Sequence, residues 1–239
     1  MCGRVGPYGA EKKTMSVVIK SREEMIFRNR AEAGRRLAVE LADVAASDAL
    51  VLAIPRGGVV VGAAIASALH YDLDIIIVRK LGAPGNSELA IGSVMEGARE
   101  PYLNKGIIRD YGVPSAYVAE ETQLQLKEAD RRAARYRNGR PKAELKGRSV
   151  ILTDDGVATG ATMISSIHGV KALHPARLIV ALPVGPRETI DEMSRMVDDL
   201  VCLSTPPFFA SVGQFYADFG QTSDAEVEEI LERFRSKVG

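Results

Sequence analysis

The chain has 239 residues, 46% of them hydrophobic and 26% charged, and its 31 basic residues are balanced by 31 acidic residues. This composition is typical of a soluble globular domain, and the zero net charge argues against binding of nucleic acid or membranes by bulk electrostatics. Cys2 and Cys202 indicate neither a disulfide framework nor a metal site, and no segment approaches the roughly 20 apolar residues of a membrane span. We therefore expect a cytoplasmic protein.

The first half of the chain starts irregularly and then alternates strands with helices. Residues 1–20 are expected to form a flexible N-terminal tail, and residues 21–239 a single domain. Apolar residues at helical spacing predict an amphipathic helix over residues 29–46. Next come a predicted strand, a helix of small residues and an isoleucine-rich strand, over residues 49–54, 59–70 and 73–78.

The alternation is interrupted by a predicted helical insert near residues 96–147, which contains a long charged helix over residues 115–137. A further strand is expected at residues 91–95, before the insert. Afterwards, strands are predicted over residues 149–153, 177–182 and 199–203, and helices over residues 160–173 and 187–196. Apolar strands followed by helices are typical of α/β folds, so we predict an open, mostly parallel sheet of about five strands with helices on both faces. A small C-terminal hood is expected near residues 204–239, with a final helix over residues 224–235.

The segment from Val150 to Thr162 has the chemistry of a sugar-phosphate site. Asp154 and Asp155 follow an apolar strand directly, at the carboxyl edge where ligands of such sheets bind. A small-residue turn then opens a helix, whose free N–H groups can bind an anion. Adjacent carboxylates can accept hydrogen bonds from vicinal sugar hydroxyls, although the two aspartates could also simply cap a turn.

This thirteen-residue segment closely resembles the phosphoribosyl-diphosphate signature of type I phosphoribosyltransferases, in which hydrophobic residues, two acids and a Thr-Gly-x-Thr turn follow one another. The resemblance implies that Asp154 and Asp155 hold the ribose 2- and 3-hydroxyls. It implies that the 5-phosphate is cradled by Gly156, Val157, Ala158, Thr159, Gly160, Ala161 and Thr162. Hypoxanthine–guanine members have an aspartate at the position of Ala158, whereas adenine-type members resemble this chain. The loop therefore supplies no general base.

A second anion loop is expected at Pro55-Arg56-Gly57-Gly58. Paired glycines let the backbone approach a polyanion closely, and the Arg56 guanidinium can bind phosphate oxygens, although such a string can also be a simple turn. The loop resembles the pyrophosphate loop of the same family. That family often has a non-prolyl cis peptide in this loop, and the resemblance places it at the Pro55–Arg56 bond.

A third loop, residues 79–90, begins with Arg79 and Lys80 and is rich in glycine and proline. This composition suits either a lid that closes on an anion or a surface hairpin. The loop resembles the flexible catalytic loop of adenine- and orotate-type members, which implies that Arg79 and Lys80 neutralise departing pyrophosphate. Glu88 could contact the substrate or face solvent.

Two further segments leave alternatives open. The arginines at positions 131, 132, 135 and 137 form either a solvated helical face or a basic rim for pyrophosphate or a partner subunit. The acidic residues within 218–232 could meet that rim across a dimer. Five of the thirteen aromatic residues lie at positions 208–219, where Phe208 and Phe209 could stack on a planar heterocycle or pack against the hood or a second subunit.

Taken together, the resemblance implies a phosphoribosyltransferase of nucleotide metabolism, within the pentosyltransferase class of glycosyltransferases. It would use phosphoribosyl diphosphate, a small nitrogen acceptor and Mg²⁺ held mainly through substrate and water. A homodimer is expected, with no nucleic-acid or membrane partner. The chain is most similar to a bacterial and archaeal branch with a similar Val-Gly-Gln-Phe-Tyr segment, which indicates no acceptor. The alternatives are a non-catalytic phosphoribosyl-diphosphate-binding regulator and a different nucleotide or sugar-phosphate enzyme on a similar sheet.

Overall fold

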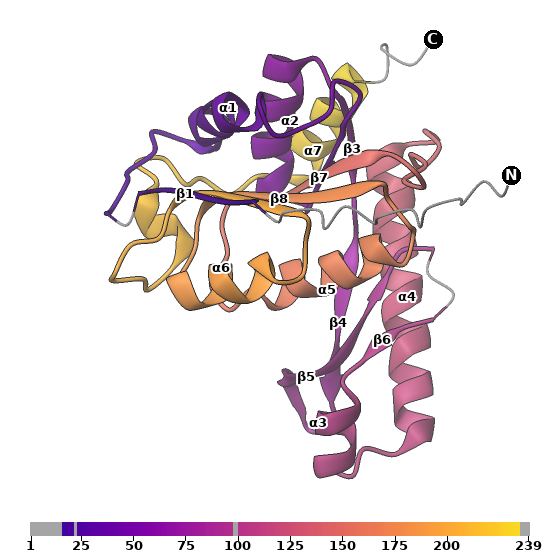
Figure 1. Cartoon of the computed structure of the whole chain (residues 1–239). Helices are drawn as coiled ribbons and strands as arrows, with labels where there is room; N and C mark the ends of the chain where they lie inside the picture. The colour runs from indigo at the N-terminus through magenta and orange to yellow at the C-terminus, as the bar shows by residue number, and fades with distance from the viewer. Residues whose placement is uncertain (1–15, 22, 98–99, 235–239) are drawn as a thin grey trace, which may run out of the picture.

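The computed structural model describes residues 16–21, 23–97 and 100–234 and has a parallel sheet at its centre (Figure 1). The sheet contains six strands in the order β1-β9-β8-β7-β2-β3, and all neighbouring strands are parallel. The strands are β1 (Ser16–Ser21), β2 (Leu50–Ala53), β3 (Asp72–Ile75), β7 (Ser149–Thr153), β8 (Arg177–Val184) and β9 (Asp199–Ser204). The predicted open, mostly parallel sheet is confirmed.

Helices cover both faces of this sheet, because its strands are apolar on both sides. One face packs against α1 (Arg30–Leu41), α2 (Gly57–Leu69) and α7 (Asp224–Arg233), and the other against α5 (Ala161–Lys171) and α6 (Arg187–Ser194). Alternation along β2 divides the core: Val51 and Ala53 face the first layer, whereas Leu50 and Leu52 face the second. None of the helices in the described part of the chain combines the length and apolar character needed to cross a membrane.

The sixth strand, β1, comes from the segment that the sequence predicts as a flexible tail. Residues 16–20 belong to β1, which pairs with β9 in the register Val17↔Leu200 and Val18↔Val201. Residues 1–15 of the expected tail lie outside the described residues. Pairing with an existing sheet edge satisfies backbone groups that this short segment could not satisfy alone.

The insert begins earlier than predicted and contains strands as well as helices. It comprises β4 (Val78–Ala83), β5 (Asn86–Met95), β6 (Tyr102–Leu103), α3 (Lys105–Asp110) and α4 (Ser115–Arg137). Its three strands form a separate antiparallel sheet that projects from the main sheet beside α4 (Figure 1). Residues 79–90, predicted as either a lid or a hairpin, lie in the β4–β5 hairpin. The insert has its own small core around Leu81, Ile91 and Val118.

The C-terminal segment after β9 packs against the chain that precedes α1. Phe27 donates its N–H to the carbonyl of Phe215 at 2.8 Å, and the rings of Phe27 and Tyr216 lie 5.4 Å apart. Between β9 and α7, a 3₁₀ turn, Val212–Phe215, is the one helical element in an otherwise irregular stretch of described residues. Phe209, Phe215 and Tyr216 of the predicted aromatic cluster thus pack within the protein, and the structure describes the C-terminal segment as far as residue 234. That this segment forms a hood stays a prediction.

Cys202 lies in the middle of β9 and is fully buried. Burial raises the pKa of its thiol to about 12, so little thiolate exists at neutral pH. We expect iodoacetamide to leave Cys202 unmodified in the native protein and to alkylate it fully in guanidinium chloride. Peptide mass spectrometry distinguishes it from Cys2, and rapid native labelling of Cys202 would contradict its burial.

Candidate active site

The two predicted anion loops lie side by side at the carboxyl edge of the main sheet. Strands β2 and β7 are neighbours, with Ala53 paired to Thr153, so both chains leave the sheet at the same level. The loop at Pro55–Gly58 therefore lies beside Asp154 and Asp155. The Pro55–Arg56 peptide bond is cis, as the resemblance implies.

The paired glycines are needed because the two carboxylates lie against the start of α2. A Cβ atom on Gly57 would come within 1.9 Å of an Asp155 carboxylate oxygen, and one on Gly58 within 2.8 Å of an Asp154 carboxylate oxygen. No real side chain accepts the first of these contacts. The glycines thus bring the backbone of one loop directly onto the acidic pair of the other.

The two carboxyl groups of the acidic pair are costly to ionise in the folded protein. Asp154 accepts hydrogen bonds from the backbone N–H groups of Asp155, at 2.8 Å, and Gly58. Burial nevertheless raises the pKa of Asp154 well above its usual range, and the neighbouring charge of Asp155 raises it further. Burial also raises the pKa of Asp155, although its hydrogen bond with Arg30 opposes the shift. Both carboxyl groups would gain from donors supplied by a ligand.

Arg30 is the main site residue that the sequence analysis missed. Its Nε lies 2.7 Å from the Asp155 carboxylate, and its Nη1 donates to the carbonyl of Gly220 at 2.7 Å. The guanidinium also lies 3.9 Å from the centre of the Phe219 ring and is only 11% exposed. The one local signal is Asn29, which caps α1 and places Arg30 at its first position, but this does not identify the distant carboxylate.

Replacing Arg30 with glutamine is expected to raise the pKa of Asp155, because the cation that opposes the burial effect is lost. A carboxyl group whose pKa is raised by folding destabilises the protein as the pH rises through that pKa. The variant should therefore lose more thermal stability at pH 8 than at pH 4, and carboxyl ¹³C NMR should show the shifted titration. Arg35→Gln, which removes an exposed arginine of the same helix, is the control. An unchanged Asp155 titration in Arg30→Gln would contradict this role.

The predicted phosphate loop presents accessible groups at the start of α5. Ala158, Thr159, Ala161 and Thr162 are exposed, whereas Gly156, Val157 and Gly160 are buried. Gly160 has a φ of 74°, and a Cβ atom there would lie 2.6 Å from Thr189, so this turn favours glycine on both grounds. The carbonyl of Ala158 accepts a hydrogen bond from the Thr189 hydroxyl at 3.0 Å, which fixes the loop against α6. The first N–H groups of α5 have no helical acceptor and can bind an anion.

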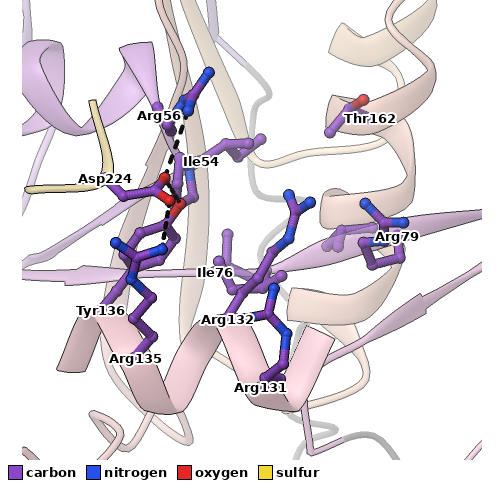
Figure 2. A pocket seen from close by; sticks show the side chains of 13 residues that line it. Ile54, Arg56, Ile76, Arg79, Arg131, Arg132, Arg135, Tyr136, Thr162 and Asp224 are labelled. Atoms are coloured by element: carbon purple, nitrogen blue, oxygen red, sulfur yellow. Dashed lines mark hydrogen bonds and ion pairs between the residues drawn. The ribbon is translucent and has the colours of Figure 1, made fainter. Parts of the chain in front are cut away.

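Next to these loops lies a cavity of about 310 Å³ that we call the arginine pocket (Figure 2). It is reached by five arginine side chains from three parts of the chain. They are Arg56 after β2, Arg79 in β4, and Arg131, Arg132 and Arg135 in α4. Three of the four helix arginines that sequence analysis left as either a solvated face or a basic rim thus share a cavity with the predicted pyrophosphate loop, whereas Arg137 does not line it.

Two other expectations concern residues around this pocket. The acidic C-terminal segment meets the basic helix within one chain, because Arg135 pairs with Asp224 at 2.7 Å and with Glu228 at 2.8 Å. Lys80 is exposed on β4. Phe208 is 85% exposed, whereas Phe209 packs 5.1 Å from Phe215, so the two predicted base-stacking residues differ in accessibility.

The fold and these loops define an α/β protein whose sheet edge suits a phosphorylated sugar. A family model described as "Phosphoribosyl transferase domain" matches residues 23–219, and the chain belongs to this family.

The relatives agree with this assignment. The chain is 40% identical over 209 residues to Mycobacterium tuberculosis proteins of strains H37Rv and CDC 1551, named "Putative phosphoribosyl transferase Rv0571c" and "Putative phosphoribosyl transferase MT0597". The match covers 87% of this chain and 47% of each relative, so the chain spans about half the length of these curated relatives. It is also similar to the crystal structure of TT1426 from Thermus thermophilus. That match has 43% identity and a TM-score of 0.80, and covers 88% of this chain and 99% of the other.

Proposed function

We propose that this protein transfers the 5-phosphoribosyl group of phosphoribosyl diphosphate to a small nitrogen acceptor and releases pyrophosphate. The observation that carries the proposal is the juxtaposition of Asp154 and Asp155 with two anion loops, residues 55–58 and 156–162, at one sheet edge. The acidic pair matches the ribose hydroxyls, and the loops match the two phosphorylated ends of the same molecule. The reaction would occur in the cytoplasm, and a homodimer stays a prediction.

The transfer would proceed by attack of the acceptor nitrogen on C1 of the ribose. The C1–oxygen bond breaks, its electron pair leaves with pyrophosphate, and positive charge develops on the ribose ring. Asp154 and Asp155 would anchor the hydroxyls and favour that charge, while Arg56, Arg79 and Lys80 would stabilise the leaving group. Positioning and electrostatic stabilisation are the main tasks in such a reaction.

Mg²⁺ fits this site as an ion shared with the substrate. The carboxylate oxygens of Asp154 and Asp155 are hard ligands of the kind Mg²⁺ prefers, but no three acidic, histidine or cysteine side chains form a metal cluster among the described residues. The remaining ligands would come from phosphate oxygens, ribose hydroxyls and water. Bound there, the ion would neutralise charge on the leaving group.

A screen for pyrophosphate release tests the proposal. The protein would be incubated with phosphoribosyl diphosphate, Mg²⁺ and a panel of purines, pyrimidines and small amines. We expect acceptor-dependent release of pyrophosphate and formation of the matching phosphoribosyl product. Tight binding of phosphoribosyl diphosphate without turnover across the panel would instead favour the non-catalytic regulator.

The same screen tests a prediction about the acceptor. The methyl group of Ala158 can neither accept a hydrogen bond from an N–H group nor take up a proton. The loop therefore lacks a group that would select 6-oxopurines. We expect adenine-like or unconventional nitrogen heterocycles to exceed hypoxanthine and guanine by about 100-fold or more in kcat/KM. Efficient turnover of hypoxanthine with adenine inert would contradict this expectation.

A further inference from the structure

The arginine pocket holds more positive charge than the pyrophosphate loop alone supplies. Arg56 is its single arginine from that loop, whereas α4 adds Arg131, Arg132 and Arg135, and β4 adds Arg79. Three carboxylates, from Glu128, Asp224 and Glu228, contact these five guanidinium groups among the described residues. The pocket is therefore cationic, and its occupant should be a compact polyanion.

The guanidinium groups of α4 and β4 are hydrogen-bonded to neighbouring side chains of the protein. Glu128 accepts hydrogen bonds from Arg131 at 2.8 Å and from Arg132 at 2.7 Å, one helical turn away. Arg79 donates to the side-chain oxygen of Gln125, also on α4, at 2.9 Å. Each guanidinium has five N–H donors, so these contacts leave others for an anion.

The far side of the pocket is organised around Asp224. Its carboxylate accepts hydrogen bonds from Arg135 and the Tyr136 hydroxyl, each at 2.7 Å, and lies 3.5 Å from Arg56 (Figure 2). Burial, together with the hydrogen bond to Asp224, raises the pKa of Tyr136 to about 12, so this hydroxyl stays protonated and donates. Arg56 and Arg135 thus have a partner in α7, whereas Arg131 and Arg132 are hydrogen-bonded to Glu128 of their own helix.

We propose that Arg131 and Arg132 of α4 bind the pyrophosphate group, together with Arg56 and Arg79. This inference rests on the proposed function and adds two arginines of a helix to its leaving-group site. Thr162, at the start of the phosphate helix, also lines the pocket, so the pocket adjoins the place proposed for the phosphoribosyl group. Guanidinium groups that are already oriented stabilise departing negative charge without reorganising during the reaction.

The test is calorimetric titration of the full chain with two separate probes, inorganic pyrophosphate and ribose 5-phosphate, in the presence of Mg²⁺. Arg131→Gln with Arg132→Gln should weaken pyrophosphate binding by about tenfold or more, since each lost contact is a charge-assisted hydrogen bond. Binding of ribose 5-phosphate, which probes the phosphate loop, should be nearly unchanged. Lys105→Gln with Arg109→Gln in α3 removes the same charge outside the pocket and should affect neither probe.

Unchanged pyrophosphate affinity in the α4 variant, equal weakening of both probes, or no pyrophosphate binding by the unmodified protein would overturn the assignment. If the double variant does not fold, the affinities of Arg132→Gln alone for pyrophosphate and for ribose 5-phosphate are compared in the same way. Selective loss of pyrophosphate binding in a protein that never binds ribose 5-phosphate would support the pocket while contradicting the proposed transfer. The failure of one proposal is thereby distinguished from the failure of the other.

Discussion

Replacing Asp154 and Asp155 together with asparagine is expected to weaken binding of phosphoribosyl diphosphate by about 100-fold or more. Each carboxylate is proposed to accept charge-assisted hydrogen bonds from ribose hydroxyls, and two such losses amount to roughly 3–6 kcal/mol. The same variant should make the unliganded protein more stable. Burial raises the pKa of both carboxyl groups, so the folded protein holds their ionised forms at a cost that asparagine avoids.

The pH dependence separates this stability gain from a general effect. A raised carboxyl pKa costs stability only as the pH rises through it, so variant and wild type should melt alike near pH 3.8 and diverge above it. At neutral pH we expect the free energy of unfolding of the variant to exceed that of the wild type by roughly 0.5–2 kcal/mol. Each kcal/mol corresponds to a rise of about 2–4 °C in the thermal midpoint. Titration calorimetry measures the affinity for phosphoribosyl diphosphate, and scanning calorimetry measures the thermal stability. Asp43→Asn with Asp48→Asn, at two exposed positions, is the charge-matched control. Unchanged affinity in the site variant would contradict the assignment of the acidic pair.

The second large effect is expected at Arg137, whose side chain fixes the end of α4 to the main sheet. Its buried guanidinium pairs with Asp74 at 2.9 Å and with Glu96, and donates to the carbonyl of Ile75 at 2.8 Å. Arg137→Met would leave buried Asp74 without its cation and buried Glu96 with only Lys142, 3.9 Å away. Breaking a buried ion pair costs about 3–5 kcal/mol in other proteins. We expect the thermal midpoint to fall by roughly 10 °C.

A triple variant shows whether unpaired buried charge causes the loss of stability in Arg137→Met. Adding Asp74→Asn and Glu96→Gln to Arg137→Met removes the unpaired carboxylates and should recover most of the lost stability. Arg109→Met, at an exposed position on α3, should leave the midpoint nearly unchanged. A single Arg137→Met variant as stable as the wild type would show that this cluster does not hold α4.

The sequence predicted the elements whose signals are local. Helix α4 begins and ends at the predicted residues, and strand β7 with its acidic pair is where the apolar run and the phosphate turn placed it. Strand β1 could not be predicted in the same way, because its partner β9 lies near the other end of the chain. Strand β3 ends at Ile75 instead of residue 78, because Val78 already belongs to the separate hairpin sheet.

The parts of the site that were missed depend on tertiary contacts. Arg30 reaches Asp155 across 125 residues of sequence, so no spacing rule connects them. The helix arginines looked equivalent in the sequence, yet Arg135 points to the arginine pocket and Arg137 to the buried cluster beneath the sheet. A helix turns about 100° per residue, so residues two positions apart can face opposite surroundings. Which face meets the sheet is decided by packing.

A crystal structure of the protein with phosphoribosyl diphosphate and Mg²⁺ would test the central claim most directly. We expect the ribose 2- and 3-hydroxyls on Asp154 and Asp155, the 5-phosphate on residues 156–162, and the pyrophosphate on Arg56 in the arginine pocket. Ribose bound away from the acidic pair, with the 5-phosphate outside the loop at the start of α5, would contradict it.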